Sequence, residues 1–452
     1  MVVGGLSCAL DRPVDAASTS AFRIAFGTLL LVSTLRFFKH GWIRDLYQTP
    51  THFFHYWGLA WVRPLPAPAM FALYALLAAA ALCIALGVAC RVAASVFALG
   101  FSYAHFCDKA NYLNHYYLIS LIACLCALLP LDRCYSLYAW RHPLQRRGQV
   151  RAWVLYLLRF QVAVVYVFGG IGKLGADWLI QGEPLRIWLA ANVELPVLGR
   201  FFVLPLAGVV FSWCGALFDL SIVPLLCWRV TRGPAYAVLV VFHVLTALLF
   251  HIGMFPWLMI VSATIFWSPS WPRHLLRRCC GRALRPVVDV VDGVAGAPLG
   301  AAPAAVAVLY VAVQLLFPLR SALYPGNTLW SEEGFRFAWK VMLIEKAGDL
   351  EFEVVDRAGK RHLVLPGEYL TPFQARMAST QPDMILELAH WVARDFEAQG
   401  QGPVRVFAAC QVSFNGRRRQ PLIDPHTDLA IEQDGLGAKP WILPAPESAP
   451  LF

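Results

Sequence analysis

Residues 151–172 read RAWVLYLLRFQVAVVYVFGGIG, a run in which Arg151 and Arg159 are the only charged residues. About 20 mostly apolar residues are what an α-helix needs to cross the hydrocarbon core of a membrane. If shorter runs are accepted inside a bundle, eight further runs meet this criterion: 19–38, 67–89, 92–106, 115–130, 203–228, 235–252, 253–267 and 302–319. The sequence therefore predicts an α-helical integral membrane bundle of about nine spans. Eight spans remain possible, because the run 253–267 is short and the run 203–228 is long.

The composition of the whole chain agrees with a membrane protein. Of its 452 residues, 58% are hydrophobic and 15% are charged, whereas soluble globular proteins have roughly 45–50% and roughly 25%. A soluble protein with so few charges could not cover its own surface with polar groups, so most of the excess apolar surface must face lipid. The same figures exclude a disordered chain, a coiled coil and a collagen-like protein.

The positive charge of the chain is confined to its hydrophobic part. Residues 1–319 contain 24 Lys and Arg against 11 Asp and Glu, whereas residues 320–452 contain 14 against 17. If the N-terminus is cytoplasmic, the inner segments hold 14 of the basic residues and the outer loops hold seven, as the positive-inside rule requires. We therefore expect a multi-pass protein with a cytoplasmic N-terminus, an extracytoplasmic C-terminal region and no nucleic-acid partner.

The C-terminal region has the patterns of a small, mostly β, soluble domain. A helix is predicted over 382–397, where apolar residues recur at helical spacing. Runs rich in β-forming residues predict strands at 335–344, 350–355, 361–365 and 404–414. The last of these is followed by the hairpin signal Asn415-Gly416. We therefore divide the chain into a transmembrane domain, 1–319, and a soluble β-rich cap domain, 320–452.

No pattern in the sequence indicates a metal site. The 12 cysteines include no CxxC pair at zinc spacing. His52 and His55 are spaced to share a helical face, as are His243 and His251, but neither pair belongs to a longer histidine cluster. We therefore expect no metal.

One lysine stands at the end of an apolar helix. Residues 168–178 read FGGIGKLGADW, in which Lys173 follows three glycines. A lysine there could be desolvated enough to lose its charge and act as a base. Alternatively, it could extend to the membrane surface beside Asp177 and Trp178. The residues alone leave both interpretations open.

Two further positions at the membrane carry polar candidates. Asn114 and His115 open the fourth run, on the same predicted side as Lys173. They could orient a carbonyl or hydroxyl group, although an asparagine that opens a helix is also a common N-cap. Asp219 lies within the sixth run, and we expect it to pair with an arginine or histidine of another helix.

Seven motifs in order resemble those of the vitamin K-dependent γ-glutamyl carboxylase family, including bacterial relatives known as horizontally transferred transmembrane domain proteins. The likeness extends from about residue 10 to about residue 445. The motifs are Asp11-Arg-Pro-Val-Asp15, Asn114-His115, Gly169-Gly-Ile-Gly-Lys173-Leu-Gly-Ala-Asp177-Trp178, Phe218-Asp-Leu-Ser221, His251-Ile-Gly-Met-Phe255, Trp330 with Phe335-Arg-Phe-Ala-Trp339, and Ile423-Asp-Pro425.

The resemblance implies roles for particular residues. Lys173 would deprotonate vitamin K hydroquinone, His115 would support the reactive intermediates, and Asn114 would contact the quinone. The aromatic segment after the last span would hold the glutamate substrate through Phe335, Phe337, Trp339 and Met342. The animal enzymes carry a second lysine before this base, where this chain has Gly172.

The resemblance also implies a reaction. Oxidation of vitamin K hydroquinone by O₂ to the epoxide would generate a strong base that removes the γ-proton of a glutamate, and the carbanion would add CO₂ to give γ-carboxyglutamate. The substrate would be a glutamate-containing peptide or protein, and no metal would be needed. Two alternatives remain: a quinol epoxidase or oxidase that acts on another substrate, and a non-catalytic membrane protein that binds a quinone or lipid.

Overall fold

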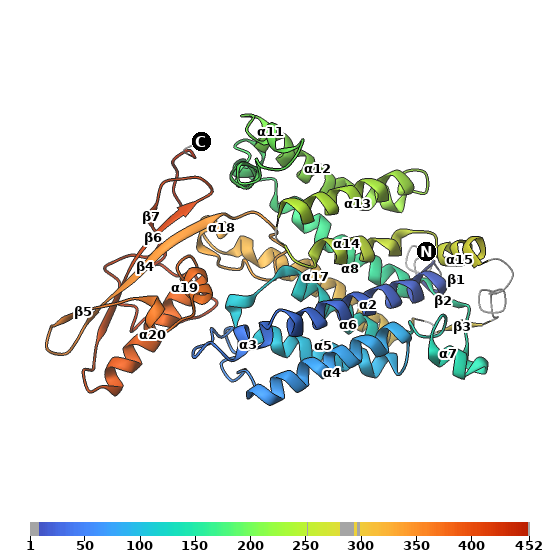
Figure 1. Cartoon of the computed structure of the whole chain (residues 1–452), viewed down its shortest axis with the longest axis horizontal. Helices are drawn as coiled ribbons and strands as arrows, with labels where there is room; N and C mark the ends of the chain where they lie inside the picture. Colours follow the sequence, from blue (N-terminus) through green and yellow to red (C-terminus); the bar gives the residue numbers. More distant parts are fainter. Residues whose placement is uncertain (1–8, 251, 281–292, 296–298, 451–452) are drawn as a thin grey trace.

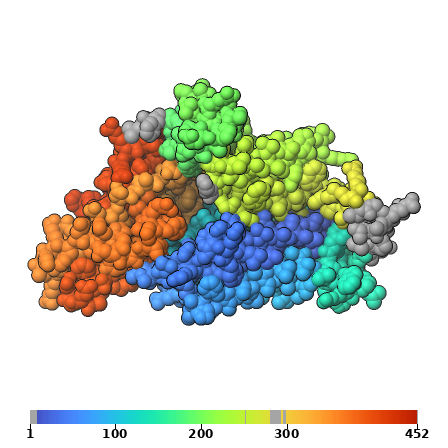
Figure 2. Space-filling view, viewed as in Figure 1, coloured from blue at the N-terminus to red at the C-terminus, as the bar shows by residue number. Residues whose placement is uncertain are grey.

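The long helices of the protein lie side by side along the long axis of the molecule (Figure 1). The computed structural model describes residues 9–250, 252–280, 293–295 and 299–450. A region of sheet and short helices, residues 320–450, covers one end of the bundle, and we call this region the cap. The described N-terminal residues lie at the opposite end. Figure 2 shows the cap seated directly against the bundle.

Each of the nine predicted runs contains a helix. These helices are α2 (Ala17–Lys39), α4 (Ala67–Leu86), α5 (Cys90–Phe106), α6 (Asn114–Leu128), α8 (Ala152–Gly172), α12 (Ala207–Cys227), α13 (Arg232–Leu249), α14 (Phe255–Ala263) with η3 (Thr264–Phe266), and α17 (Ala301–Leu319). Within the described residues, six helical segments are long and apolar enough to cross a membrane: α2, α4, α8, α12, α13 and 301–323. These six indicate a multi-pass membrane protein, but the predicted count of about nine spans is not confirmed.

A three-stranded sheet closes the end of the bundle opposite the cap. Its strands are β1 (Pro13–Asp15), β2 (Gln149–Arg151) and β3 (Val294–Ala295), with β1 antiparallel and β3 parallel to the central β2. Sequence reasoning did not predict this sheet, because strands of two or three residues are too short to show a periodic pattern. The remaining short elements of the bundle are α3 (Trp42–Tyr47), η1 (Lys109–Asn111), α7 (Leu137–Arg141), η2 (Pro143–Gln145), α9 (Ala176–Leu179), α10 (Leu185–Ala190), α11 (Gly199–Phe202) and α15 (Trp271–Cys280).

A buried arginine joins the helix ends near this sheet. Arg23 of α2 is 0% exposed and donates to the carbonyl oxygens of Ile84 and Ala85, at 2.5 and 2.7 Å, at the end of α4. It also donates to Leu131 and Tyr135 beyond α6, at 3.1 and 2.6 Å. Carbonyls in the last turn of a helix lack their usual intrahelical partner, and Arg23 supplies donors to two of them.

The cap contains a four-stranded antiparallel sheet in the order β5-β4-β6-β7. The strands are β4 (Lys346–Val355), β5 (Arg361–Val364), β6 (Arg405–Phe414) and β7 (Gln420–Pro421), and the helical segments are η5 (Arg320–Leu323), α18 (Thr328–Ser331), η6 (Pro366–Glu368), α19 (Pro372–Ala378) and α20 (Pro382–Ala398). The predicted strands at 350–355, 361–365 and 404–414 lie in β4, β5 and β6, and the helix at 382–397 is α20. Asn415 and Gly416 both have positive φ, 44° and 76°, where the chain turns after β6.

The predicted strand at 335–344 is wrong. No strand is assigned there, and Phe337, Trp339 and Met342 have φ values of 63°, 56° and 57°, which a strand does not allow. The aromatic residues that suggested a strand fill space between the cap and the bundle instead. Trp339 is 1% exposed and stacks on Tyr117 of α6 with 4.9 Å between ring centroids. We call residues 332–345 the junction segment.

Candidate functional site

A cavity of about 310 Å³ lies among α8, α12, α13 and the junction segment, and we call it the membrane cavity. Most of its wall is apolar, with side chains from Val165, Phe211, Leu249, Phe250, Phe255 and Met259. The polar side chains in its wall belong to Tyr166, Lys173, Asp219, His243 and Thr246. A mostly apolar pocket with a few polar groups is the usual form of a small-molecule site.

Lys173 occupies the end of α8, and its amine turns inward. Its side chain is 8% exposed, and Nζ donates to Asp219 Oδ2 of α12 at 2.6 Å and to the Gly169 carbonyl at 3.3 Å. Nζ also lies 5.3 Å from the ring centroid of Trp178. A lysine that extended to the membrane surface would not be buried in this way. The sequence predicted that Asp219 pairs with an arginine or histidine. That prediction is wrong, because its cationic partner is Lys173.

Two glycines explain how Asp219 reaches Lys173. A Cβ atom added to Gly170 would lie 2.7 Å from the Leu220 side chain and 3.2 Å from Cβ of Asp219. A Cβ atom added to Gly169 would lie 3.4 Å from Asp219 Oδ2. The absence of side chains at these positions lets α12 approach α8 closely, and this approach places the carboxylate beside the amine.

His243 contributes a second polar group to the membrane cavity. Its Nε2 lies 2.8 Å from the Tyr166 hydroxyl, while its Nδ1 is buried without a hydrogen-bond partner among the described residues. A buried polar atom without a partner costs about 1–3 kcal/mol, so this nitrogen is available to a ligand. The sequence made His243 a candidate because a polar residue at membrane depth is costly to bury, and it also paired His243 with His251, which lies outside the described residues. The sequence assigned His243 no particular role.

His115 is buried but is not among the residues that line the membrane cavity. Its ring packs on Tyr116 at 4.8 Å and lies 6.2 Å from Phe255. Phe255 does line the cavity and lies 6.0 Å from His243. His115 therefore stands next to the cavity wall rather than in it.

Asn114 hydrogen-bonds to the junction segment. Its Nδ2 donates to the Lys340 carbonyl at 3.2 Å, and its Oδ1 accepts from the Tyr112 hydroxyl at 2.9 Å. That hydroxyl in turn accepts from the backbone N–H of Phe337 at 2.6 Å. Asn114 makes no side-chain cap of α6, so the N-cap interpretation does not describe it.

The junction segment separates the membrane cavity from a second, larger one. The larger cavity, of about 890 Å³, is lined by Phe335 and Phe337, whereas Met342 faces the membrane cavity; we call the larger one the cap cavity. Holding bulky residues at positive φ costs on the order of 1–3 kcal/mol each. Such strain is maintained only when neighbouring contacts, here those of Tyr112 and Asn114, fix the backbone.

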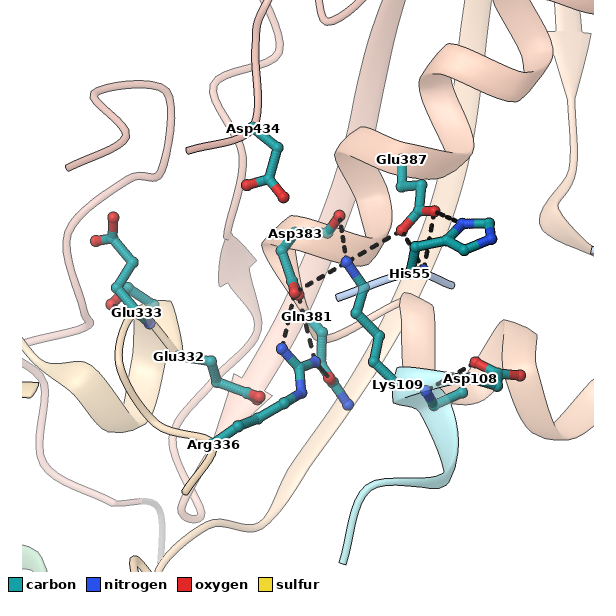
Figure 3. Close-up of polar contacts among 12 residues, drawn as sticks. His55, Asp108, Lys109, Glu332, Glu333, Arg336, Gln381, Asp383, Glu387 and Asp434 are labelled. Carbon is teal, nitrogen blue, oxygen red and sulfur yellow. Dashed lines mark hydrogen bonds and ion pairs between the residues drawn. The ribbon is translucent and has the colours of Figure 1, made fainter. Parts of the chain in front are cut away.

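Charged side chains attach the cap to the bundle beside the cap cavity (Figure 3). Lys109 Nζ lies 3.1 Å from both Asp383 and Glu387 of α20. Arg336 of the junction segment contacts Asp383 at 2.7 Å. Although burial opposes ionisation, the charges of Arg336 and Lys109 hold the pKa of Asp383 below its usual value.

A second contact attaches the cap next to Lys173. Arg417, just after β6, contacts Asp177 through two nitrogens at 2.9 and 2.6 Å. Asn415 donates to the same carboxylate at 3.1 Å. The loop that follows Lys173 is thus held by the hairpin of the cap sheet.

The structure brings the predicted site residues together only in part. Lys173 and Met342 share the membrane cavity, and Phe335 and Phe337 share the cap cavity, whereas the lining of neither cavity includes Asn114, His115 or Trp339. No group of three or more His, Cys, Asp or Glu that could hold a metal occurs among the described residues.

Comparison with known proteins identifies both parts of the chain. No solved structure matches it. A family model described as the HTTM domain matches residues 11–271. A second, described as the lumenal domain of vitamin K-dependent γ-carboxylase, matches residues 301–448. The chain, with an HTTM domain over more than half its length and this lumenal domain after it, belongs to the vitamin K-dependent γ-glutamyl carboxylase family.

Proposed function

We propose that this protein couples oxidation of a vitamin K-type hydroquinone to its epoxide with carboxylation of glutamate to γ-carboxyglutamate. Family membership supports this class of reaction. The observation that carries the proposal is the Lys173–Asp219 pair, which lies at 2.6 Å in the wall of an apolar cavity. The bound hydroquinone would supply the reducing equivalents and, with O₂, the strong base that the reaction needs.

The residues of the membrane cavity fit a quinol. Ligand pockets of about 300 Å³ are large enough for a small aromatic head group, and the apolar wall suits its rings. The amine of Lys173 and the unpartnered Nδ1 of His243 are polar groups that could bind its hydroxyls.

Lys173 acts as the base in this proposal. Both members of the Lys173–Asp219 pair are buried, and removal from water penalises separated charges. With the shared proton on Asp219, the amine would be neutral and could accept a proton from a quinol hydroxyl. His115 supports the cavity through Phe255, and Asn114, the proposed quinone contact, also holds the junction segment.

The glutamate substrate occupies the cap cavity in this proposal. Phe335 and Phe337 line it, and the junction segment continues through Trp339 to Met342 in the membrane cavity. An acceptor bound against the aromatic side chains would lie next to the segment that closes the quinol site.

One assay tests the proposal and its alternatives. Purified protein is given reduced vitamin K, O₂, labelled bicarbonate and a glutamate peptide, and epoxide and fixed label are scored separately. We expect both products. Epoxide without label would indicate a quinol oxidase, and quinone binding without either product would indicate a non-catalytic protein; both results contradict the proposal.

A further inference from the structure

Three of the four acidic side chains that line the cap cavity form ion pairs with basic side chains of the protein. Asp383 contacts Lys109 and Arg336. Glu332 contacts Lys346 at 2.9 Å, and Asp434 contacts Lys439 at 3.4 Å. Glu333 accepts the backbone N–H of Lys439 at 3.1 Å. Figure 3 shows these four acids together with Lys109 and Arg336.

Arg320 lines the same cavity and has no such partner. It is the first residue of η5, directly after α17. Its guanidinium donates to the Phe317 carbonyl at 2.9 Å and to the Arg336 carbonyl, and its centre lies 4.0 Å from the Phe317 ring centroid. Within the part of the chain that the structure describes, no carboxylate forms an ion pair with it.

A half-buried guanidinium without a counter-ion loses hydration and gains no compensating charge interaction. Two of its five N–H donors are used by carbonyls, which leaves donors free for a ligand. The planar arrangement of these donors matches a carboxylate, which an arginine binds through two parallel hydrogen bonds. Exposed apolar side chains at the cavity rim, Trp57 and Leu323, would suit the neighbouring residues of a peptide.

We infer that Arg320 binds a carboxylate of an acidic acceptor peptide in the cap cavity, beside Phe335 and Phe337. The inference rests on the proposed function, because it names the residue that recognises the acceptor. A peptide is favoured over a lipid phosphate because the wall of the cavity that Arg320 lines includes the junction segment and residues 434–439 of the cap, which are protein rather than lipid. In addition, the guanidinium is held against the Arg336 carbonyl, within that wall.

The test is a binding measurement without quinol. Fluorescence anisotropy compares a labelled peptide that has one central Glu between leucines with its Gln counterpart, using the full chain in uncharged detergent. We expect the wild type to prefer the Glu peptide by about tenfold or more, as for a charge-assisted hydrogen bond. Arg320→Gln should bring the two affinities within about twofold. Arg44→Gln, at an exposed arginine of α3, is the matched control and should keep the preference.

Further measurements keep the inference testable if Arg320→Gln folds poorly. The wild-type preference should shrink between 50 and 500 mM salt, on the order of the screening expected for a partly exposed pair, and Arg320→Lys should retain part of it. Equal wild-type affinities, or an undiminished preference in Arg320→Gln, would overturn the inference. The inference would also be overturned if Arg320→Gln lost binding to phosphatidylglycerol nanodiscs but kept the preference for the Glu peptide. Arg320 would then hold a lipid phosphate. Absence of epoxide in the turnover assay would contradict the quinol proposal and leave this binding result unchanged.

Discussion

The amine of Lys173 and the carboxylate of Asp219 form a pair between two membrane helices, and both groups are buried. Removing such a pair from water costs free energy, so it adds little to the stability of the fold. Its presence in the wall of a cavity is better explained by a role in a reaction. His243 in the same wall supports this view, because its Nδ1 has no hydrogen-bond partner among the residues that the structure describes.

Lys173→Ala should abolish both epoxide formation and label fixation, because every later step depends on deprotonation of the quinol. The loss of a general base typically lowers the rate by about 10²–10⁴-fold. Lys173→Arg should also be inactive, because a guanidinium does not deprotonate. Lys39→Ala, at the exposed end of α2, is the control and should leave both products unchanged. Near wild-type epoxidation by Lys173→Arg would rule out Lys173 as the base.

At the scale of elements, the close approach of α8 and α12 determines whether Lys173 and Asp219 can meet. Gly170→Ala introduces a Cβ atom 2.7 Å from Leu220. Overpacking of this kind costs about 1–3 kcal/mol, which the gain in helix propensity, at most about 1 kcal/mol, offsets only in part. We expect a lower melting temperature in detergent and slower epoxidation, because Asp219 is pushed away from the amine.

Gly175→Ala is the matched control, because a Cβ atom there would have no neighbour within 4 Å. It should melt as the wild type does and form epoxide at the same rate. Equal melting temperatures and rates for the two alanine variants would show that the α8–α12 approach does not depend on Gly170.

A buried carboxyl in the loop before η1 makes the attachment of the cap sensitive to pH. Burial raises the pKa of Asp108 from 3.8 to about 6, while Gln374 of α19 donates to it at 2.8 Å. Because the folded protein binds this proton more tightly than the unfolded chain does, stability is highest below about pH 4 and is lost as pH rises through about 6. The largest change in the free energy of unfolding that this one carboxyl can cause is about 3 kcal/mol.

We therefore expect the melting temperature to fall between pH 5 and pH 7.5, and Asp108→Asn to reduce this fall. Asp383 acts in the opposite direction. Because its pKa is lowered in the folded protein, its contribution to the free energy of unfolding is present at neutral pH and is lost only as pH falls well below 4. Scanning calorimetry of both proteins at three pH values measures the difference. A pH dependence that Asp108→Asn leaves unaltered would exclude this carboxyl as its source.

At the scale of the whole molecule, the cap and the three-stranded sheet lie at opposite ends of the bundle (Figure 1). The matched lumenal domain indicates that the cap is extracytoplasmic, and the distribution of arginines supports a cytoplasmic N-terminus as a proposal. The two ends should therefore differ in their access to reagents that cannot cross a membrane.

A cysteine introduced at exposed Gln145 should be shielded from an impermeant thiol reagent in intact cells, in a variant without native cysteines. A cysteine at exposed Lys360, in the turn before β5, should be labelled. Permeabilised cells provide the control, since both positions should then react. Equal labelling in intact cells, or the reverse pattern, would contradict the proposed orientation.

Features encoded by neighbouring residues could be predicted from the sequence alone. The apolar runs predicted the positions of the bundle helices, and the patterns at 350–355, 361–365, 382–397 and 404–414 predicted β4, β5, α20 and β6 of the cap. These predictions succeed because hydrophobic length and periodicity are local properties. Lys173 could be selected as a candidate for the same reason, since its unusual feature is a charge after three glycines.

Other features depend on residues that are far apart in the chain, and only the tertiary structure decided them. Asp219 meets Lys173 across 46 residues, and Asn114 meets Lys340 across 226. The left-handed backbone at Phe337, Trp339 and Met342 opposes the strand preference of those residues, because contacts between the cap and the bundle outweigh a preference worth about 1 kcal/mol. The sequence by itself thus determined the positions of the long helices and of the longer cap strands, whereas long-range packing decided the junction segment and which polar groups face one another.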